Sequence, residues 1–260
     1  MVDTFLASTL RLTMTTPDPN YSYNDIAKMI DHSLLNPALT VPELEAGCML
    51  ARTYNSASVC ILPYYVAHSA ELLAGSTVVV STTLGFPHGG HKTSVKLFEA
   101  EQAIHDGARE LDAVINISKA RSGDWRYVRS EIEALTTFIH GAGAKIKVIF
   151  ENAYHDNAAK IRLCEICGEI GVDWVKSSTG YAATGATLED LRLMRKHSPE
   201  AVQVKAAGGI RTLDALLEVR AIGVTRVGAT RTAEMLDDCR ARLGLPALAS
   251  LASGTPPAGY

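Results

Sequence analysis

One segment is especially informative about the architecture of this chain: Val202-Gln203-Val204-Lys205-Ala206-Ala207-Gly208-Gly209-Ile210-Arg211-Thr212. A short apolar run ends in a lysine, breaks at a glycine pair and leads into a helix-like segment. Backbone N–H groups at a helix N-terminus bind anions. The sequence Gly228-Ala229-Thr230-Arg231 repeats this order after the next apolar run, and Arg231 could form a forked contact with a phosphate. We therefore predict a phosphate site made of two neighbouring loops.

Short apolar runs alternate with segments of helical period along the rest of the chain. Such alternation predicts parallel strands joined by right-handed helical crossovers. Two helices have clear start signals, at Thr187-Leu188-Glu189-Asp190 and at Thr212-Leu213-Asp214. The predicted strands are Ile30–Leu34, Ser58–Leu62, Val78–Thr83, Glu110–Ile115, Lys145–Phe150, Trp174–Ser177, Val202–Lys205 and Arg226–Gly228. The predicted helices lie near 41–53, 66–74, 94–106, 125–140, 156–170, 187–197, 212–222 and 232–243.

The position of the glycine loops separates two architectures. A doubly wound open sheet usually has its glycine-rich loop after the first strand. A (β/α)8 barrel has its phosphate site after the seventh and eighth strands, where these loops fall. We predict a single (β/α)8 TIM barrel domain over residues 1–260. Residues 1–21 would form a short extension and residues 244–260 a flexible tail.

Composition excludes several classes of function. The chain of 260 residues is 47% hydrophobic and 20% charged, with a net charge of −3 and no basic block, so nucleic acid is not an expected partner. The longest apolar runs are too short for a membrane span, and the N-terminus lacks the pattern of a secretory signal. Five cysteines, an odd number, indicate reduced thiols in a cytoplasmic protein. Cys164 and Cys167 lie in a helical pattern, which predicts that both face the core.

Lysines end two of the predicted strands. Lys176 lies in Asp173-Trp174-Val175-Lys176-Ser177-Ser178-Thr179-Gly180, and Lys205 lies in the stretch quoted first. Lysine is rarely buried without a partner. Two adjacent amines disfavour each other's charged form, and a neutral lysine is a nucleophile toward carbonyls. The pair therefore indicates Schiff-base chemistry.

The carboxyl ends of barrel strands hold the catalytic groups. Asp112 lies in an apolar strand and needs a cationic or hydrogen-bonding partner, which the lysines could supply. A purely structural ion network is the alternative, although perturbed titratable groups cluster at active sites. A second alternative is a metal-dependent aldolase using His88 and His91, but a third ligand at a recognisable spacing is missing, so we expect no metal.

These motifs resemble the deoxyribose-phosphate aldolase family. The resemblance covers about residues 30 to 236 and is most specific at the two lysine motifs. It rests on Asp31–Pro37, Val59–Ile61, Gly85–Gly89, Glu110–Asp112, Lys147–Glu151, Val175–Gly180 and Lys205–Arg211. The resemblance implies a class I aldolase on a (β/α)8 barrel, with no metal or other cofactor and with a dimer or tetramer. It also implies a sugar phosphate and acetaldehyde as small-molecule partners, in deoxyribonucleotide and carbohydrate degradation.

The resemblance also implies roles for individual residues. Lys176 matches the Schiff-base lysine, Lys205 the second lysine, and Asp112 the acid/base carboxylate that works through a water. Tyr260 matches a terminal tyrosine that assists proton transfer in some members. The implied substrate-binding residues are Asp31, Ser33, Cys60, Lys147, Thr179, Gly180, Gly208, Gly209, Gly228 and Arg231.

The sequence departs from the family pattern beside the expected phosphate. Many relatives have paired serines where this chain has Thr230-Arg231, and some have a lysine where this chain has Tyr181. Arg231 could compensate for both losses. Two further functions therefore stay open. One is the same mechanism on another sugar phosphate or an unphosphorylated aldehyde, and the other is a phosphosugar-binding barrel without catalysis.

Overall fold

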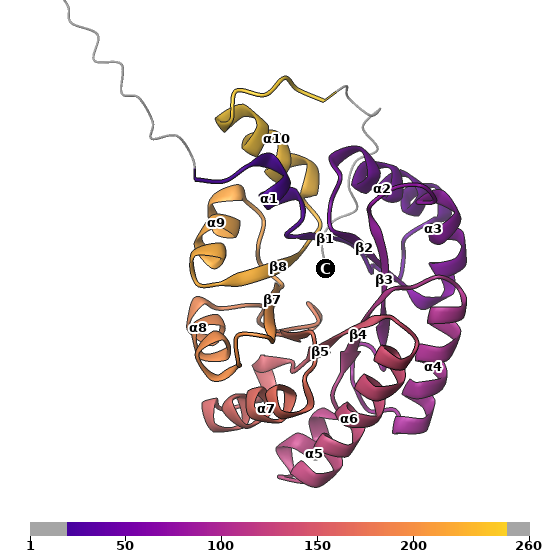
Figure 1. The fold of residues 1–260 in the computed structure, drawn as a ribbon, viewed down its shortest axis with the longest axis vertical. Coiled ribbons are helices and arrows are strands. Elements are labelled where there is room, and N and C mark those ends of the chain that lie inside the picture. The colour runs from indigo at the N-terminus through magenta and orange to yellow at the C-terminus, as the bar shows by residue number, and fades with distance from the viewer. Residues whose placement is uncertain (1–19, 249–260) are drawn as a thin grey trace, which may run out of the picture.

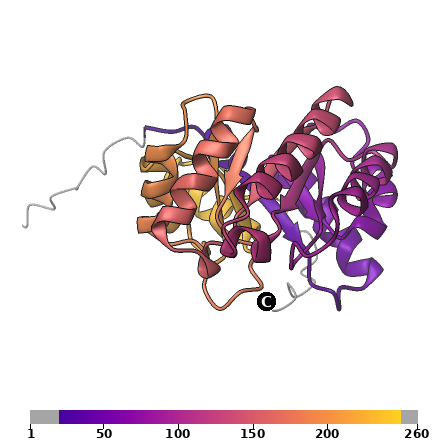
Figure 2. The same ribbon diagram turned by 90° about the horizontal axis from the view of Figure 1, so that it is seen from below.

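The computed structural model describes residues 20–248, in which eight parallel strands close into one barrel in chain order, β1 to β8. Helices surround the strands (Figure 1), and the view turned by 90° shows them along the outside (Figure 2). The predicted (β/α)8 architecture is confirmed. The strands are β1 Ile30–Leu34, β2 Ser58–Ile61, β3 Val79–Leu84, β4 Glu110–Val114, β5 Lys145–Ile149, β6 Trp174–Lys176, β7 Gln203–Ala207 and β8 Val224–Ala229.

The helices follow the strands with short connections. They are α1 Tyr23–Ala27, α2 Val41–Tyr54, α3 Val66–Leu72, α4 Thr93–His105, α5 Ile117–Arg121, α6 Trp125–Gly141, α7 Asn157–Ile170, α8 Leu188–His197, α9 Leu213–Ala221 and α10 Thr232–Arg242, with 3-10 turns at Pro63–Tyr65 and Asn152–Tyr154. The predicted starts of two of them are confirmed. Thr187 Oγ1 accepts a hydrogen bond from the Asp190 amide at 3.1 Å, and Thr212 Oγ1 accepts one from Ala215 at 3.2 Å.

Alternate residues of a strand contribute to two different buried regions, an apolar layer against the helices and a charged region inside the barrel. Successive side chains of a strand point to opposite faces. Leu111 and Ala113 of β4 belong to the apolar core, and so do Ile146 and Val148 of β5. The residues between them include Asp112 and Lys147, which are equally buried but pair with each other. The sequence therefore places apolar groups against the helices and charged groups inside the barrel.

The last strand is longer than predicted. We expected Arg226–Gly228, but β8 begins at Val224, because Gly223 adopts a left-handed φ of 97° directly after α9 and lets the chain turn into the strand. Thr225 interrupts the apolar pattern, yet its hydroxyl accepts a hydrogen bond from Trp174 Nε1 at 3.1 Å.

Two short helices were missed. α1 precedes the barrel and packs against α10 (Figure 1). α5 begins after Asn116, whose side chain accepts a hydrogen bond from the Lys119 amide at 3.1 Å. Both are five residues long, which is too short for a helical period to be read from the sequence.

The cysteines behave as predicted: all five are free and buried, Cys164 and Cys167 within α7. None of the helices in residues 20–248 is long and apolar enough to cross a membrane. Most of the predicted extension and tail, including Tyr260, lies outside the described residues.

Candidate active site

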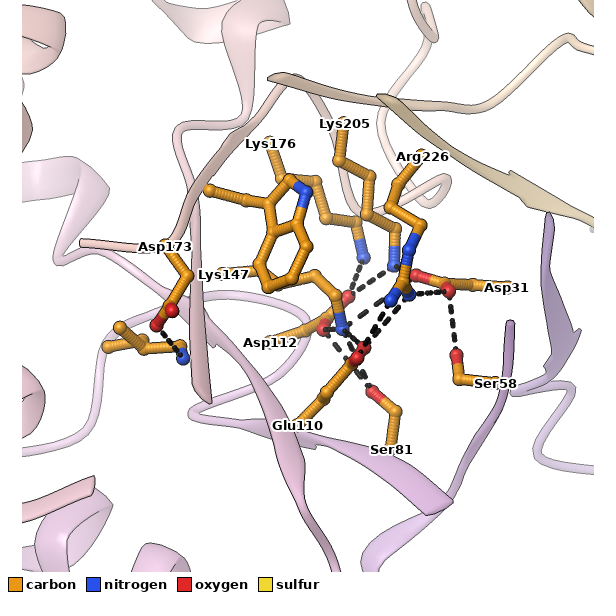
Figure 3. Close-up of polar contacts among 12 residues, drawn as sticks. Asp31, Ser58, Ser81, Glu110, Asp112, Lys147, Asp173, Lys176, Lys205 and Arg226 are labelled. Carbon is orange, nitrogen blue, oxygen red and sulfur yellow. Dashed lines mark hydrogen bonds and ion pairs between the residues drawn. The ribbon is translucent and has the colours of Figure 1, made fainter. Parts of the chain in front are cut away.

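Lys176 is the last residue of β6, and Lys205 lies beside it in the middle of β7, which continues two residues beyond its predicted end. Their Cα atoms are register partners in the parallel pair, so both side chains enter the barrel at the same level. Each Nζ atom lies 2.7 Å from Oδ2 of Asp112, as Figure 3 shows. The sequence-predicted pair of amines and the predicted carboxylate therefore meet at one oxygen atom.

Asp112 is fully buried and is held by three lysines. Lys147 Nζ lies 2.8 Å from the other carboxylate oxygen, Oδ1. Burial alone would raise the pKa of Asp112, but Lys147, Lys176 and Lys205 outweigh burial and hold it well below the ordinary value. The carboxylate is therefore ionised, and in this form it can accept a proton or pair with a cation. It can donate a proton only after it has taken one from a neighbouring amine.

The pKa values of Lys176 and Lys205 are shifted in opposite directions. Burial lowers the pKa of Lys176, and the charge of Lys205 lowers it further against the opposing effect of Asp112. Lys205 is also buried, but Asp112 and Asp31 more than offset the burial and raise its pKa. Its Nζ lies 2.6 Å from Asp31 Oδ2, a carboxylate that Lys176 does not contact. The extra carboxylate keeps Lys205 charged, and Lys176 is left as the amine that loses its proton more easily.

A cavity opens above the lysines. Its walls include ten of the fourteen residues that the sequence and the resemblance singled out. Thr179, Gly180, Gly208, Gly209 and Gly228 line it together with Lys176, Lys205, Asp31, Ser33 and Cys60. Burial and the nearby Asp112 raise the pKa of the Cys60 thiol, so it is present in its neutral form. The cavity thus has amines at its base and glycine loops at its rim.

The glycine loops approach each other too closely for side chains. Gly208 has a left-handed φ of 81°, and an added Cβ would lie 2.8 Å from Gly185 Cα. The Ala186 amide of the β6–α8 loop donates to the carbonyls of Ala207 and Gly208, at 3.0 and 3.1 Å. The two loops are therefore joined by their backbones, which leaves the rim narrow and rich in backbone groups.

Two of the predicted substrate-binding residues do not line this cavity. Arg231 is exposed and is not among the residues that line the cavity; Arg211, which directly follows Ile210 in the other glycine loop, lines it instead. Lys147 is completely buried and does not line the cavity. It is the register partner of Asp112, whereas Ile149, two residues further along β5, is the register partner of Lys176.

Glu151 is a site residue that the sequence reasoning missed. It follows β5 with a left-handed φ of 58°, and only 2% of it is exposed. Its carboxylate accepts hydrogen bonds from the Thr179 hydroxyl and from the Thr179 amide at 3.3 Å. Burial raises its pKa. Glu151 thereby fixes the loop after Lys176, and a glutamate directly after an apolar strand was the available signal.

A larger cavity of about 480 Å³ adjoins this site and shares Thr179 with it. His88 and Tyr181 are on its wall. The Tyr181 hydroxyl donates to the Leu35 carbonyl at 2.7 Å, which joins the loop after β6 to the end of β1. His91 lies 3.6 Å from Glu99, and within residues 20–248 no cluster of three potential metal ligands occurs.

Comparison with known proteins agrees with this geometry. The family model described as DeoC/LacD family aldolase matches residues 26–229, which is most of the barrel. This chain belongs to that aldolase family. The DeoC/LacD match begins within α1 and ends at the last residue of β8, so it contains Lys176, Lys205 and Asp112.

Individual members of the family are also similar. The deoxyribose-phosphate aldolase of Rhodopirellula baltica is 60% identical over 93% of this chain and 99% of its own length. That of Thermococcus gammatolerans is 43% identical over 83% and 97%. The tetrameric deoxyribose phosphate aldolase of Aeropyrum pernix superimposes with a TM-score of 0.78 at 27% identity, covering 84% of this chain and 92% of that one.

Proposed function

We propose that this aldolase, a lyase, reversibly cleaves 2-deoxy-D-ribose 5-phosphate to acetaldehyde and D-glyceraldehyde 3-phosphate through a Schiff base on Lys176. The reaction is the one that the names of the 60% and 43% identical relatives give. The observation that carries the assignment to Lys176 is its position. It lies 2.7 Å from an ionised Asp112, lines the cavity and has a lowered pKa.

The chemistry follows from these groups. The neutral Nζ of Lys176 attacks C1 of the open-chain sugar, and loss of water from the carbinolamine gives an iminium. The iminium accepts the electron pair of the C2–C3 bond, so that glyceraldehyde 3-phosphate leaves and an enamine remains. Protonation at C2 and hydrolysis then release acetaldehyde and restore the amine.

Proton transfers need a base and an acid beside Lys176. Asp112, working with Lys205 and a bound water, removes the proton of the C3 hydroxyl and returns a proton to C2. Placed acids and bases typically contribute about 10²–10⁴-fold. The predicted contribution of Tyr260 to the same step stays a prediction, since that residue lies outside the described part of the chain.

Reductive trapping tests the proposal. Borohydride added with acetaldehyde or the sugar phosphate should reduce the iminium and attach the substrate carbon irreversibly to Lys176, which mass spectrometry of peptides locates. A chelator should leave turnover intact, because no step uses a metal. An adduct on another lysine, or loss of turnover with EDTA, would contradict the mechanism. A substrate panel with phosphorylated and unphosphorylated sugars separates the open alternatives, including binding without turnover.

Arg211 is the arginine that we expect to hold the substrate phosphate. It lies at the cavity rim beside the backbone groups of Gly208 and Gly209. Arg211→Ala should raise KM for deoxyribose 5-phosphate by roughly 10–100-fold, the value of a charge-assisted hydrogen bond, and should change KM for unphosphorylated deoxyribose little. Arg231→Ala is the matched comparison, with a smaller effect. The reverse order would return the role to Arg231.

Three further expectations accompany the function. The tetramer named for the Aeropyrum pernix protein supports a homodimer or homotetramer for this chain. The five free, buried cysteines are consistent with the reducing cytoplasm. A sugar phosphate that carries a deoxyribose unit places the reaction in deoxyribonucleotide and carbohydrate degradation.

A further inference from the structure

Six charged side chains at the base of the cavity and beneath it form a closed ring in which positive and negative groups alternate (Figure 3). Five strands contribute to it, and the ring lies across the barrel interior. In order around the ring they are Arg226, Glu110, Lys147, Asp112, Lys205 and Asp31.

Arg226 and Glu110 belong to the part of the ring that lies outside the cavity wall. Arg226 of β8 forms a bidentate contact with Glu110, the first residue of β4, at 2.8 and 3.0 Å. The same guanidinium donates to Asp31 of β1. Glu110 in turn lies 2.7 Å from Lys147 of β5.

The charges of the ring cancel. It contains three cations and three carboxylates, and the carboxylates of Asp31, Glu110 and Asp112 all have lowered pKa values because the cations outweigh the effect of burial. The pKa of Lys147 is raised for the converse reason, and arginine keeps its charge in any case. Because each carboxylate of the ring is already balanced by a cation in a water-poor interior, the ring offers no uncompensated negative charge to a seventh, positively charged group.

Lys176 is that seventh group. It joins the ring through the oxygen of Asp112 that Lys205 also contacts. The other titratable groups facing it are Cys60 from β2 and Glu151 after β5. The thiol is neutral, and the carboxylate has a pKa raised by burial and is bonded to Thr179. Neither group therefore provides a full negative charge that would balance a protonated Lys176.

We propose that Arg226 and Glu110 are positioning residues that balance the charge of the ring and thereby leave Lys176 as the amine without a proton. The proposal rests on the proposed function of Lys176 as the nucleophile. It assigns a role in catalysis to two residues that do not line the cavity. Removing a charge of either sign there should change the proton affinity of Lys176 in opposite directions.

The test is the pH dependence of borohydride trapping at Lys176, measured in three variants. Arg226→Met removes one positive charge from the ring, so Lys176 should hold its proton more strongly. The acid limb of the profile, the low-pH side on which Lys176 becomes protonated, should therefore move to higher pH by roughly one unit. Glu110→Gln leaves the ring one negative charge short, and the limb should move to lower pH. The double variant Arg226→Met/Glu110→Leu is neutral again, and its limb should return toward that of the unchanged protein.

A second buried ion pair provides the control. Lys96 and Glu131 are both fully buried and lie 3.0 Å apart, but they do not touch the ring. Lys96→Met should lower the melting temperature as the ring variants do and leave the acid limb in place. The proposal would be overturned if the acid limbs of all variants coincided with that of the unchanged protein, or if both single variants shifted the limb in the same direction. Absence of any trapped adduct in the unchanged protein would instead refute the proposed function.

Discussion

Lys176→Met should abolish turnover of deoxyribose 5-phosphate, with a loss in kcat of at least about 10³-fold, as for other covalent nucleophiles. Methionine has nearly the same length and no amine, so the buried position is filled while the iminium cannot form. The buried Asp112 loses one of three lysine partners but keeps Lys147 and Lys205, at 2.8 and 2.7 Å, so the barrel should still fold. Lys176→Arg should be equally inactive, because a guanidinium stays protonated and cannot attack.

The measurement combines single-turnover kinetics with the trapping experiment. Circular dichroism should show an unchanged fold in Lys176→Met, and the borohydride adduct should disappear. Lys145→Met is the matched control, since Lys145 is the exposed first residue of β5; its rate and its adduct should stay as they are. Residual turnover within tenfold of the unchanged enzyme in Lys176→Met would mean that another amine carries the reaction.

Lys205→Leu should shift the acid limb of the pH–rate profile to higher pH by roughly one unit and lower activity at neutral pH strongly. The sign follows from charge: removing the cation that shares Asp112 Oδ2 with Lys176 lets Asp112 attract the remaining amine without competition. The pKa of Lys176 then rises, and less of it is neutral at a given pH. The proton transfers in which Lys205 takes part are lost as well.

Stability should fall in this variant, because Asp31 loses a cation at 2.6 Å. Lys160→Leu is a suitable comparison. Its amine lies 2.6 Å from Asp190, in an ion pair on the outer helices, so its removal should leave the pH profile unchanged. A Lys205→Leu enzyme with the original acid limb would show that the two strand-end amines are not coupled, whatever the loss in rate.

The fold could be predicted because its signals are local. Each strand is an apolar run and each long helix has a periodic apolar face, while the late position of the glycine loops distinguishes a barrel from an open sheet. The lysine pair could also be predicted, because a charged residue that ends an apolar strand is conspicuous. Register then places Lys176 beside Lys205 without further information.

The remainder depends on distances that a sequence does not contain. Burial, rather than Lys205, is the largest cause of the lowered pKa of Lys176, and burial is set by the complete barrel. Arg211 and Arg231 are equivalent in sequence, each following a glycine loop, and only the backbone path shows which lines the cavity. Glu110 and Arg226 escaped notice because each begins a predicted strand, whereas catalytic groups are expected at the carboxyl ends of barrel strands.

The ring also limits how this barrel can be made more heat-resistant. Replacing a buried ion pair by apolar residues of similar volume is often neutral or stabilising. In most barrels the end opposite the active site is where such redesign is safe. Here Trp174 packs over Lys147 and Arg226, at 5.6 and 5.0 Å from its ring centre, so an apolar redesign of this floor would start from a ready-made aromatic surface. Only replacements that remove charges in pairs of opposite sign would increase thermal tolerance without loss of catalytic rate.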